Sequence, residues 1–308
     1  MLLENRPCPV CSSPEHEVLF LARSRAGECS PPIESKYVKC KQCGLIYLNP
    51  LPDFSELNVL YNEMPVQQEE TYIEKLLSRL EYLLSPLLDK VEYYHTMPHT
   101  RGGGRKLLDI GCGDGRKLVR FRDNGWEIYG VDISKKAIEV AQRRVPDGYF
   151  YCGTLKAAAF PDDYFDCIRL DNVLGHIPDP VDMLAEIRRI LRPGGELFIY
   201  VPSGEGFTLG WLPRYSVSSW VPFHLNLFTR RAMLTILRQA GFAGIVNFAG
   251  CTPITWLYGC LKLFFANRSL TSGMSAAEKV IAGLMLTPIS WMLNFVGLAE
   301  ELVICVKK

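Results

Sequence analysis

The sequence predicts an α/β fold whose central sheet is mostly parallel. The main observation is that strand-like and helix-like runs alternate between residues 106 and 203. The strand-like runs are KLLDI, EIYGVDI, YFYC, FDCIRL and ELFIYVP. The chain has 308 residues, of which 48% are hydrophobic, so it can bury one large core and still carry appended segments.

Residues 1–52 differ in character from this core, because they contain two C-x-x-C pairs and little helical periodicity. The pairs place Cys8, Cys11, Cys40 and Cys43 at the spacing of a closed tetrahedral zinc site. A closed site has no open position, so the predicted zinc is structural and stabilises a lobe too small to fold on its core alone. Unconnected thiols and a redox pair are the alternatives.

Residues 53–103 are predicted to form a helical linker or lid. Apolar side chains recur at helical spacing from Ile73 to Val91, and Pro86 should kink or split this helix. The glycine-rich stretch TRGGGR closes the linker, and a core spanning 104–250 follows.

Capping residues delimit the helices of the core. Ser134 is placed to cap KKAIEVAQRR, and Asp179 before Pro180 is a start signal for VDMLAEIRRIL. The stretch RPGG is expected to end that helix and turn the chain into the next strand. A last core helix from Thr229 to Ala240 precedes the strand-like run GIVNFAG.

The turn after the first core strand has the features of a ligand-binding loop. Asp109 precedes three alternate glycines, which permit positive φ and close approach of a ligand before a helix begins. Asp132 ends the next strand, where a carboxylate can accept hydrogen bonds from a ribose diol. The G-x-G-x-G spacing differs from the G-x-G-x-x-G of NAD sites, although a tight turn without ligand remains the alternative for the glycines alone.

Four ordered segments together resemble class I S-adenosylmethionine-dependent methyltransferases: LLDIGCGDG, VDIS, FPDDYFDCIRLDNVLGHIPDP and EIRRILRPGGELFIYVPS. The resemblance covers residues 106–203 and continues more weakly to the end of the chain. It implies a Rossmann-like, seven-stranded, mostly parallel sheet with S-adenosylmethionine as the cofactor. It also implies the cofactor-binding residues, which are Asp109, Gly111, Cys112, Gly113, Gly115, Asp132, Ile133, Thr154, Leu155, Asp171, Asn172 and Val173.

Three positions depart from the family pattern. The stretch CGTLKAA lacks the acid that often contacts the adenine amino group, so Thr154 or a backbone group must serve. Gly175 stands where the family often has a glutamate before His176. Arg169 lies within a strand that should be buried, so either the strand is short or the side chain reaches out to solvent.

Two histidines are the candidate catalytic residues. Methyl transfer to oxygen or carbon needs a nucleophile held in line and a group that removes its proton, which histidine can do near neutral pH. His176 follows the fourth strand, and His224 lies in SWVPFHLNLFT, a segment that relatives carry near the substrate. Structural hydrogen bonding, packing or loop ordering is the alternative for each.

The N-terminal lobe is similar to the zinc ribbon of methyltransferases that act on sugars and other small metabolites, with CKQCGLIYLNP as the matching stretch. The loop between the cysteine pairs is not notably basic, and the net charge of the chain is only +1. Nucleic acid is therefore an unlikely partner, and the lobe is predicted to lie on the substrate side.

Residues 251–298 form an apolar insertion before a final core strand at 299–308. The uncharged run at 280–298 approaches the ~20 residues of a membrane span, but it contains Pro288 and Asn294. A single crossing would also separate the last strand from its sheet. The insertion is therefore expected to be a buried helical lid or a hairpin in a membrane interface, anchored by Trp256, Tyr258 and Trp291.

The leading functional hypothesis is S-adenosylmethionine-dependent O- or C-methylation of a small-molecule or lipid-like acceptor. The eleven cysteines and the lack of a secretory signal favour a cytoplasmic location, with peripheral membrane contact through 251–298 as an option. The alternatives are a non-catalytic, membrane-associated scaffold with a degenerate methyltransferase fold, and an RNA methyltransferase guided by the zinc lobe.

Overall fold

The computed structural model describes residues 3–24, 33–52, 102–242, 244–266 and 276–308. The helix predicted between Ile73 and Val91 lies outside the described residues, as does nearly all of the 53–103 linker. The two regions of the predicted site, the glycine turn and the cysteine pairs, both lie inside them.

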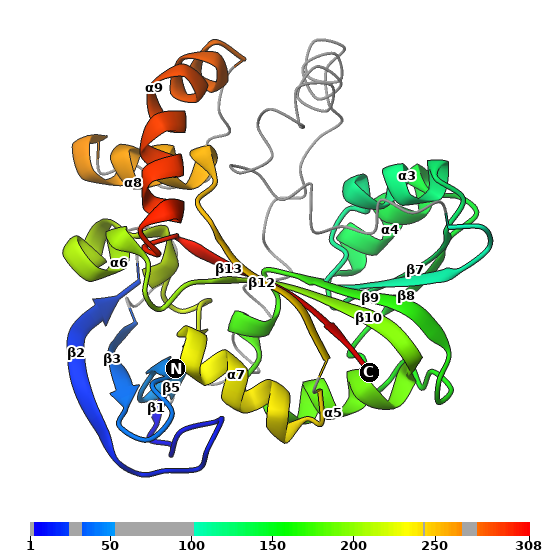
Figure 1. Cartoon of the computed structure of the whole chain (residues 1–308), viewed down its shortest axis with the longest axis horizontal. Helices are drawn as coiled ribbons and strands as arrows, with labels where there is room; N and C mark the ends of the chain where they lie inside the picture. The colour runs from blue at the N-terminus through cyan, green and yellow to red at the C-terminus, as the bar shows by residue number, and fades with distance from the viewer. Residues whose placement is uncertain (1–2, 25–32, 53–101, 243, 267–275) are drawn as a thin grey trace.

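A seven-stranded sheet forms the centre of the molecule (Figure 1), in the order β12-β13-β10-β9-β6-β7-β8. Its strands are β6 (Lys106–Ile110), β7 (Glu127–Asp132), β8 (Tyr149–Cys152), β9 (Phe165–Asp171), β10 (Leu191–Pro202), β12 (Gly244–Cys251) and β13 (Glu301–Lys307). Only β13 runs antiparallel to its neighbours β10 and β12. The predicted mostly parallel sheet and its final core strand are therefore confirmed.

Helices cover both faces of this sheet. The helices α3 (Arg116–Asp123) and α4 (Lys135–Arg144) lie on one face, and α5 (Pro180–Ile190) and α7 (Arg230–Gln239) lie on the other (Figure 1). Because side chains alternate across a strand, Leu107 and Leu108 are both fully buried but belong to different apolar clusters. Because β6, β7 and β9 run parallel to one another, their carboxyl ends lie along the same edge of the sheet, and these ends carry polar residues.

The predicted caps begin these helices as expected. The side chains of Ser134, Asp179 and Thr229 each accept a hydrogen bond from the backbone N–H three residues later. The stretch RPGG differs from the prediction, because α5 ends at Ile190 and RPGG forms an irregularity within β10. Leu191 already pairs with Phe165 of β9, so strand pairing begins before the glycines rather than after them.

Arg169 also differs from the prediction. The strand β9 continues past it to Asp171, and the side chain is 1% exposed, so the strand is not short and the side chain does not reach solvent. Two aspartates balance its charge inside the protein, as described below.

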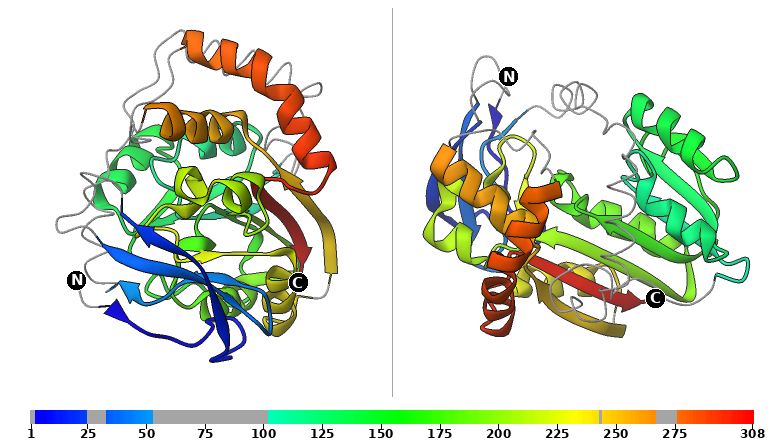
Figure 2. Two further views of the ribbon diagram at one scale, coloured as in Figure 1. Left: turned by 90° about the vertical axis from the view of Figure 1, so that its left-hand side faces the viewer. Right: turned by 90° about the horizontal axis from the view of Figure 1, so that it is seen from above.

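The N-terminal lobe consists of β1 (Leu3–Glu4), β2 (His16–Arg23), β3 (Glu34–Cys40), β4 (Ile46–Leu48) and β5 (Leu51–Pro52). It lies at the opposite end of the molecule from α3 and α4 (Figure 2). Its sheet has the order β11-β4-β3-β2, and β11 (Asn226–Leu227) comes from the core segment of the chain. The lobe and the core therefore share a sheet just after His224.

The apolar insertion forms α8 (Ile254–Ala266) and α9 (Ala276–Phe295), which pack against each other above the start of β13. Within the described parts of the chain, no helix combines the length and hydropathy that crossing a bilayer requires. The insertion is not a wholly buried lid either, because both helices leave large apolar side chains exposed: Leu261, Phe264, Phe265, Met285, Ile289, Trp291, Met292 and Phe295.

Candidate active site

The glycine turn lies at the carboxyl end of β6. Gly111, Gly113 and Gly115 have φ values of +68°, +53° and +71°, which other residues rarely adopt. A Cβ on Gly111 would lie 2.4 Å from Cγ2 of Val173, and one on Gly115 would lie 2.9 Å from Cβ of Ala141. A Cβ on Gly113 would meet nothing within 4 Å. The outer glycines therefore permit close packing, whereas the middle one faces open space.

Asp132 is fixed beside this turn by two backbone donors. Its Oδ2 accepts a hydrogen bond from the Gly113 N–H and its Oδ1 accepts one from the Ser134 N–H, both at 2.8 Å. Burial raises the pKa of Asp132, and these N–H groups oppose the rise. Each carboxylate oxygen keeps a further lone pair, so the side chain can accept hydrogen bonds from a vicinal diol.

A buried charge network connects the ends of β6 and β9. Nη1 of Arg169 donates to both carboxylate oxygens of Asp109, at 2.9 and 2.8 Å, and its Nη2 donates to Asp171. Lys117 of α3 also donates to Asp171. Two cations thus balance two carboxylates next to the glycine turn.

The two acids in this network titrate differently. Burial outweighs Arg169 and raises the pKa of Asp109 to about 6. Burial alone would also raise the pKa of Asp171, but Arg169 and Lys117 together lower it below its usual value.

The next predicted cofactor residues, Ile133, Thr154, Leu155 and Cys112, lie near the carboxyl ends of the strands and differ in their contacts. Half-buried Ile133 follows Asp132, and the carbonyl of Asp132 accepts a hydrogen bond from the Gly153 N–H, which brings Thr154 close. The Thr154 hydroxyl accepts from the Ala157 N–H within its own turn. Leu155 is 4% exposed and packs in the main core, and the thiol of Cys112 lies against Gly130.

The structure brings the two candidate histidines together. The ring centroids of His176 and His224 are 4.8 Å apart. Burial lowers the pKa of His176 to about 4, and its ring contacts the backbone of Phe223 and Asn172. His176 is therefore neutral at pH 7, is only weakly basic, and is held between two loops.

His224 has a defined tautomer. Its Nδ1 lies 2.8 Å from the carbonyl oxygen of Ser218. Because a carbonyl can only accept a hydrogen bond, Nδ1 carries the proton and Nε2 is the basic nitrogen. Of the two histidines, His224 is the one whose hydrogen bonding suits proton removal.

The N-terminal lobe holds the backbone around His224. The Tyr37 hydroxyl donates to the His224 carbonyl at 2.7 Å, and the Leu48 N–H donates to the Leu225 carbonyl at 2.9 Å. The strands β4 and β11 then pair through Tyr47 and Asn226. His224 is thus positioned by residues almost two hundred positions earlier in the chain.

Arg6 extends this connection to the His176 loop. Its guanidinium donates to the Pro178 carbonyl at 2.9 Å and to Oδ1 of Asn226 at 3.1 Å. Asn226 in turn donates to the Ile177 carbonyl at 2.7 Å. One arginine of the lobe therefore ties together the loops that carry both histidines.

The four cysteines of the lobe form a cluster that could hold a metal ion. The sulfur atoms of Cys8, Cys11, Cys40 and Cys43 all lie within 4.8 Å of one another. The Cys8–Cys43 and Cys11–Cys40 sulfur pairs are each 3.5 Å apart. Tetrahedral zinc with Zn–S bonds of about 2.3 Å requires sulfur separations of roughly 3.8 Å, so the cluster fits zinc.

Two residues near the histidines, Glu301 and Ser218, were not found from the sequence, and a third, Trp256, was expected at a membrane interface instead. Glu301 is fully buried at the start of β13, and its Oε1 accepts a hydrogen bond from Nδ2 of Asn172 at 3.4 Å. Trp256 has its ring parallel to that of His224, with centroids 6.5 Å apart, and Ser218 provides the carbonyl for Nδ1. Trp256 therefore faces the protein interior rather than a membrane. Of these residues, only Glu301 could have been suspected from the sequence, because two adjacent acids, Glu300 and Glu301, come directly before an apolar strand.

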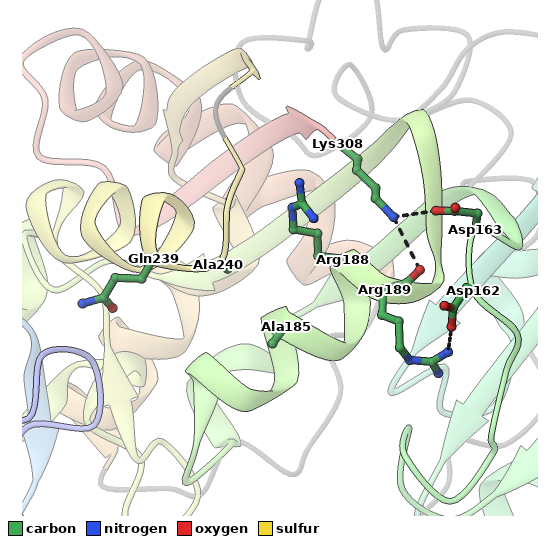
Figure 3. A pocket seen from close by; sticks show the side chains of 8 residues that line it. All are labelled: Asp162, Asp163, Ala185, Arg188, Arg189, Gln239, Ala240 and Lys308. Atoms are coloured by element: carbon green, nitrogen blue, oxygen red, sulfur yellow. Dashed lines mark hydrogen bonds and ion pairs between the residues drawn. The ribbon is translucent and has the colours of Figure 1, made fainter.

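A cavity of about 460 Å³ lies at the other edge of the sheet, where β9 begins and β13 ends (Figure 3). Its charged side chains are paired with each other or with backbone: Lys308 contacts Asp163 at 2.6 Å, Arg189 contacts Asp162, and Arg188 donates to the Gly241 carbonyl. Because the cavity lies at the start of β9 and the end of β13, it is separate from the glycine turn and the histidine pair.

Comparisons with known proteins agree with this geometry. A family model described as a methyltransferase domain matches residues 70–246. An uncharacterized 37.1 kDa protein in transposon Tn4556 of Streptomyces fradiae is 33% identical over 152 residues, covering 46% of this chain and 44% of that protein. A demethylmenaquinone methyltransferase of Renibacterium salmoninarum is 32% identical over 96 residues, covering 31% of this chain and 40% of that enzyme. The chain thus spans less than half the length of these two relatives.

Other similarities are longer. A ubiquinone biosynthesis O-methyltransferase of Chromobacterium violaceum is 27% identical over 179 residues, covering 52% of this chain and 74% of that enzyme. Geranyl diphosphate C-methyltransferase of Streptomyces coelicolor superposes with a TM-score of 0.52 at 17% identity, covering 82% of this chain and 97% of its own. This last similarity shows the fold. The family model covers more than half of the chain, so this chain belongs to the methyltransferase domain family.

Proposed function

We propose that this protein transfers a methyl group from S-adenosylmethionine to an oxygen or carbon atom of a small-molecule acceptor. The observation that carries the proposal is the arrangement at the carboxyl edge of the sheet. The glycine turn packs against Val173, Asp132 is fixed beside that turn, and the backbone of the neighbouring Asn172 contacts the ring of His176. The names of the relatives, which include quinone-biosynthesis methyltransferases, support an acceptor of small-molecule or lipid-like type.

The residues at the edge fit this cofactor. Asp132 suits the ribose diol, and the space above Gly113 suits close approach of the cofactor to the backbone. Asp109 and Asp171, although paired with Arg169 and Lys117, place carboxylate oxygens where they could accept hydrogen bonds from the α-ammonium group of the methionine portion. The cofactor supplies an electrophilic methyl group on a sulfonium, while the protein orients the acceptor, excludes water and accepts a proton.

We propose that the cysteine cluster holds a structural zinc ion and that the domains follow the sequence boundaries. Residues 1–52 would be the zinc ribbon, 53–103 the linker or lid, 104–250 the cofactor-binding core, and 251–298 the insertion before the last strand. The antiparallel sheet of the lobe and the separate cluster around Leu257 and Leu293 support these divisions.

Asp132→Ala is expected to weaken binding of S-adenosylmethionine about 10- to 100-fold. The change removes a carboxylate that would accept a charge-assisted hydrogen bond from the ribose, worth about 1.5–3 kcal/mol. Isothermal titration calorimetry measures the affinity directly. Asp162→Ala, in the cavity at the far edge of the sheet, is the matched control and should bind normally. An unchanged affinity for Asp132→Ala would remove this residue from the cofactor site.

We further propose that the exposed apolar face of α8 and α9 contacts a lipid surface. Phe265 and Phe295 are 79% and 92% exposed, Trp291 lies on the same helix as Phe295, and Lys262 of α8 is close enough to pack over the Tyr258 ring. Aromatic and apolar side chains combined with lysine suit a membrane interface.

Phe265→Ser with Phe295→Ser should reduce binding to phosphatidylcholine vesicles by about tenfold or more, because two aromatic side chains would no longer leave water. Co-sedimentation measures the bound fraction. Leu21→Ser, at an exposed apolar residue of β2, is the control and should bind as the unmodified chain does. Equal binding by the double variant would show that this face does not contact lipid.

A further inference from the structure

Three buried polar atoms close to the histidine pair have no hydrogen-bond partner within the described part of the protein. They are Oδ1 of Asn172, Oγ of Ser218 and Nε1 of Trp256. Leaving a buried polar atom unsatisfied costs about 1–3 kcal/mol, so such atoms are rarely left without a ligand or water. Their occurrence together indicates a place where a polar molecule binds.

Three different elements bring these residues next to the histidine pair. Ser218 lies in the 3-10 turn η4 (Val217–Ser219), and its carbonyl accepts the Nδ1 proton of His224. Trp256 lies in α8, parallel to the His224 ring. Asn172 ends β9, and its backbone contacts the ring of His176. The histidine pair is therefore the common neighbour of all three.

The orientation of the Asn172 amide is fixed by its neighbours. Its Nδ2 donates to Oδ1 of Asp171 at 3.2 Å and to Oε1 of Glu301 at 3.4 Å. Both of these partners are carboxylates, so the nitrogen faces them and Oδ1 faces the other way. Asn172 has a φ of +57°, so the end of the strand holds this side chain in an uncommon backbone conformation.

The unsatisfied atoms differ in hydrogen-bonding character. The Trp256 indole can only donate, the Asn172 amide oxygen can only accept, and the Ser218 hydroxyl can do both. A ligand that complements them must accept at one point and donate at another. Hydroxyl groups on neighbouring atoms of a ring meet this requirement. The faces of Trp256 and Trp220, which both contact the His224 ring, provide surfaces for the ring itself.

We propose that Asn172, Ser218 and Trp256 form the acceptor subsite, and that the acceptor is a ring bearing adjacent hydroxyl groups that is methylated on oxygen. This inference rests on the proposed methyl transfer. One hydroxyl of the acceptor gives its proton to Nε2 of His224, and its oxygen forms the new bond to the methyl carbon. The sulfur–methyl bond breaks with its electron pair remaining on sulfur, which leaves a neutral thioether, and the imidazolium releases its proton to water.

The test measures probe binding to the full chain saturated with S-adenosylhomocysteine, by ligand-observed NMR titration. The probes are 4-methylcatechol and methyl α-D-glucopyranoside, each paired with a counterpart that lacks adjacent hydroxyls, p-cresol and tetrahydropyran-2-methanol. At least one diol should bind more tightly than its counterpart. The probe that binds distinguishes an aromatic acceptor from a saturated one.

The variants Trp256→Phe and Ser218→Ala should each raise the dissociation constant of that diol about fivefold, since each removes one hydrogen bond. Trp256→Phe keeps an aromatic ring, and Ser218→Ala keeps the carbonyl that orients His224. The matched control is Trp291→Phe on the exposed face of α9, which should bind as the unmodified chain does.

Two results would overturn the subsite. One is that neither diol binds better than its counterpart, and the other is that both subsite variants bind the diol as tightly as the Trp291→Phe control. Calorimetry of S-adenosylmethionine on the same proteins tests the proposed function separately. If the unmodified chain does not bind the cofactor, the proposed methyl transfer fails, whereas the same diol titration without S-adenosylhomocysteine still decides the subsite.

Discussion

Replacing Cys40 with serine is expected to abolish binding of the proposed zinc ion and methyl transfer, while affinity for S-adenosylmethionine stays close to that of the unmodified chain. A structural zinc ion contributes about 10–16 kcal/mol in small zinc-binding peptides, so the lobe should lose its fold without it. The cofactor edge is built by β6, β7 and β9, which do not belong to the lobe. Acceptor chemistry should fail because Tyr37 and Leu48 no longer hold the backbone at His224 and Leu225.

Three measurements separate this effect from general unfolding. Elemental analysis reports the metal, calorimetry reports the cofactor affinity, and hydrogen exchange reports protection of residues 221–228. We expect loss of metal and loss of protection in that segment, with binding retained. Cys152→Ser, at an exposed thiol outside the cluster, should keep its metal. Loss of metal with unchanged methyl transfer would show that the lobe does not position His224.

Arg169→Met is expected to lower the free energy of unfolding by about 3–5 kcal/mol at pH 7. The substitution leaves Asp109 and Asp171 buried with only Lys117 to balance them, and an uncompensated buried charge is costly. Urea denaturation measures the loss. Arg189→Met is the matched control: its ion pairs with Asp162 and Glu186 are partly exposed, so it should cost about 1 kcal/mol or less. Equal losses in the two variants would contradict the buried network.

The same variant should show a specific dependence on pH. Burial raises the pKa of both Asp109 and Asp171 and Arg169 lowers it, so without Arg169 both folded-state pKa values are expected to lie above their unfolded values. The folded state then binds more protons than the unfolded state, so the destabilisation is full at neutral pH and disappears as pH falls toward the unfolded pKa of about 4. The difference in unfolding free energy between the variant and the unmodified chain should therefore shrink on acidification. A constant difference from pH 7 to pH 5 would exclude charge burial as its cause.

Features that depend on neighbouring residues were predictable from the sequence. Runs such as KLLDI and YFYC became strands with the predicted bounds, because apolar and aromatic residues next to turns favour a strand wherever it can pair. Ser134, Asp179 and Thr229 cap helices because each needs only the N–H group three residues later. The glycine turn and the C-x-x-C knuckles are local in the same sense.

Features that depend on distant pairing were not predictable. Arg169 is buried only because Asp109, sixty residues earlier, lies in the adjacent strand of the sheet. The RPGG stretch became part of β10 because Leu191 pairs with Phe165. Trp256 fits the pattern of a membrane anchor in the sequence, yet it packs against His224.

The sequence by itself determined the fold class, the cofactor turn and the four cysteines, since short-range spacing specifies backbone geometry and ligand chemistry. Only the tertiary structure decided that the lobe shares a sheet with β11, that His224 has its proton on Nδ1, and that Asn172, Ser218 and Trp256 all lie next to the histidine pair. The physical reason is that these features depend on the register in which distant strands pair. Which side chains meet across strands and loops depends on long-range pairing, and no local pattern in the sequence encodes it.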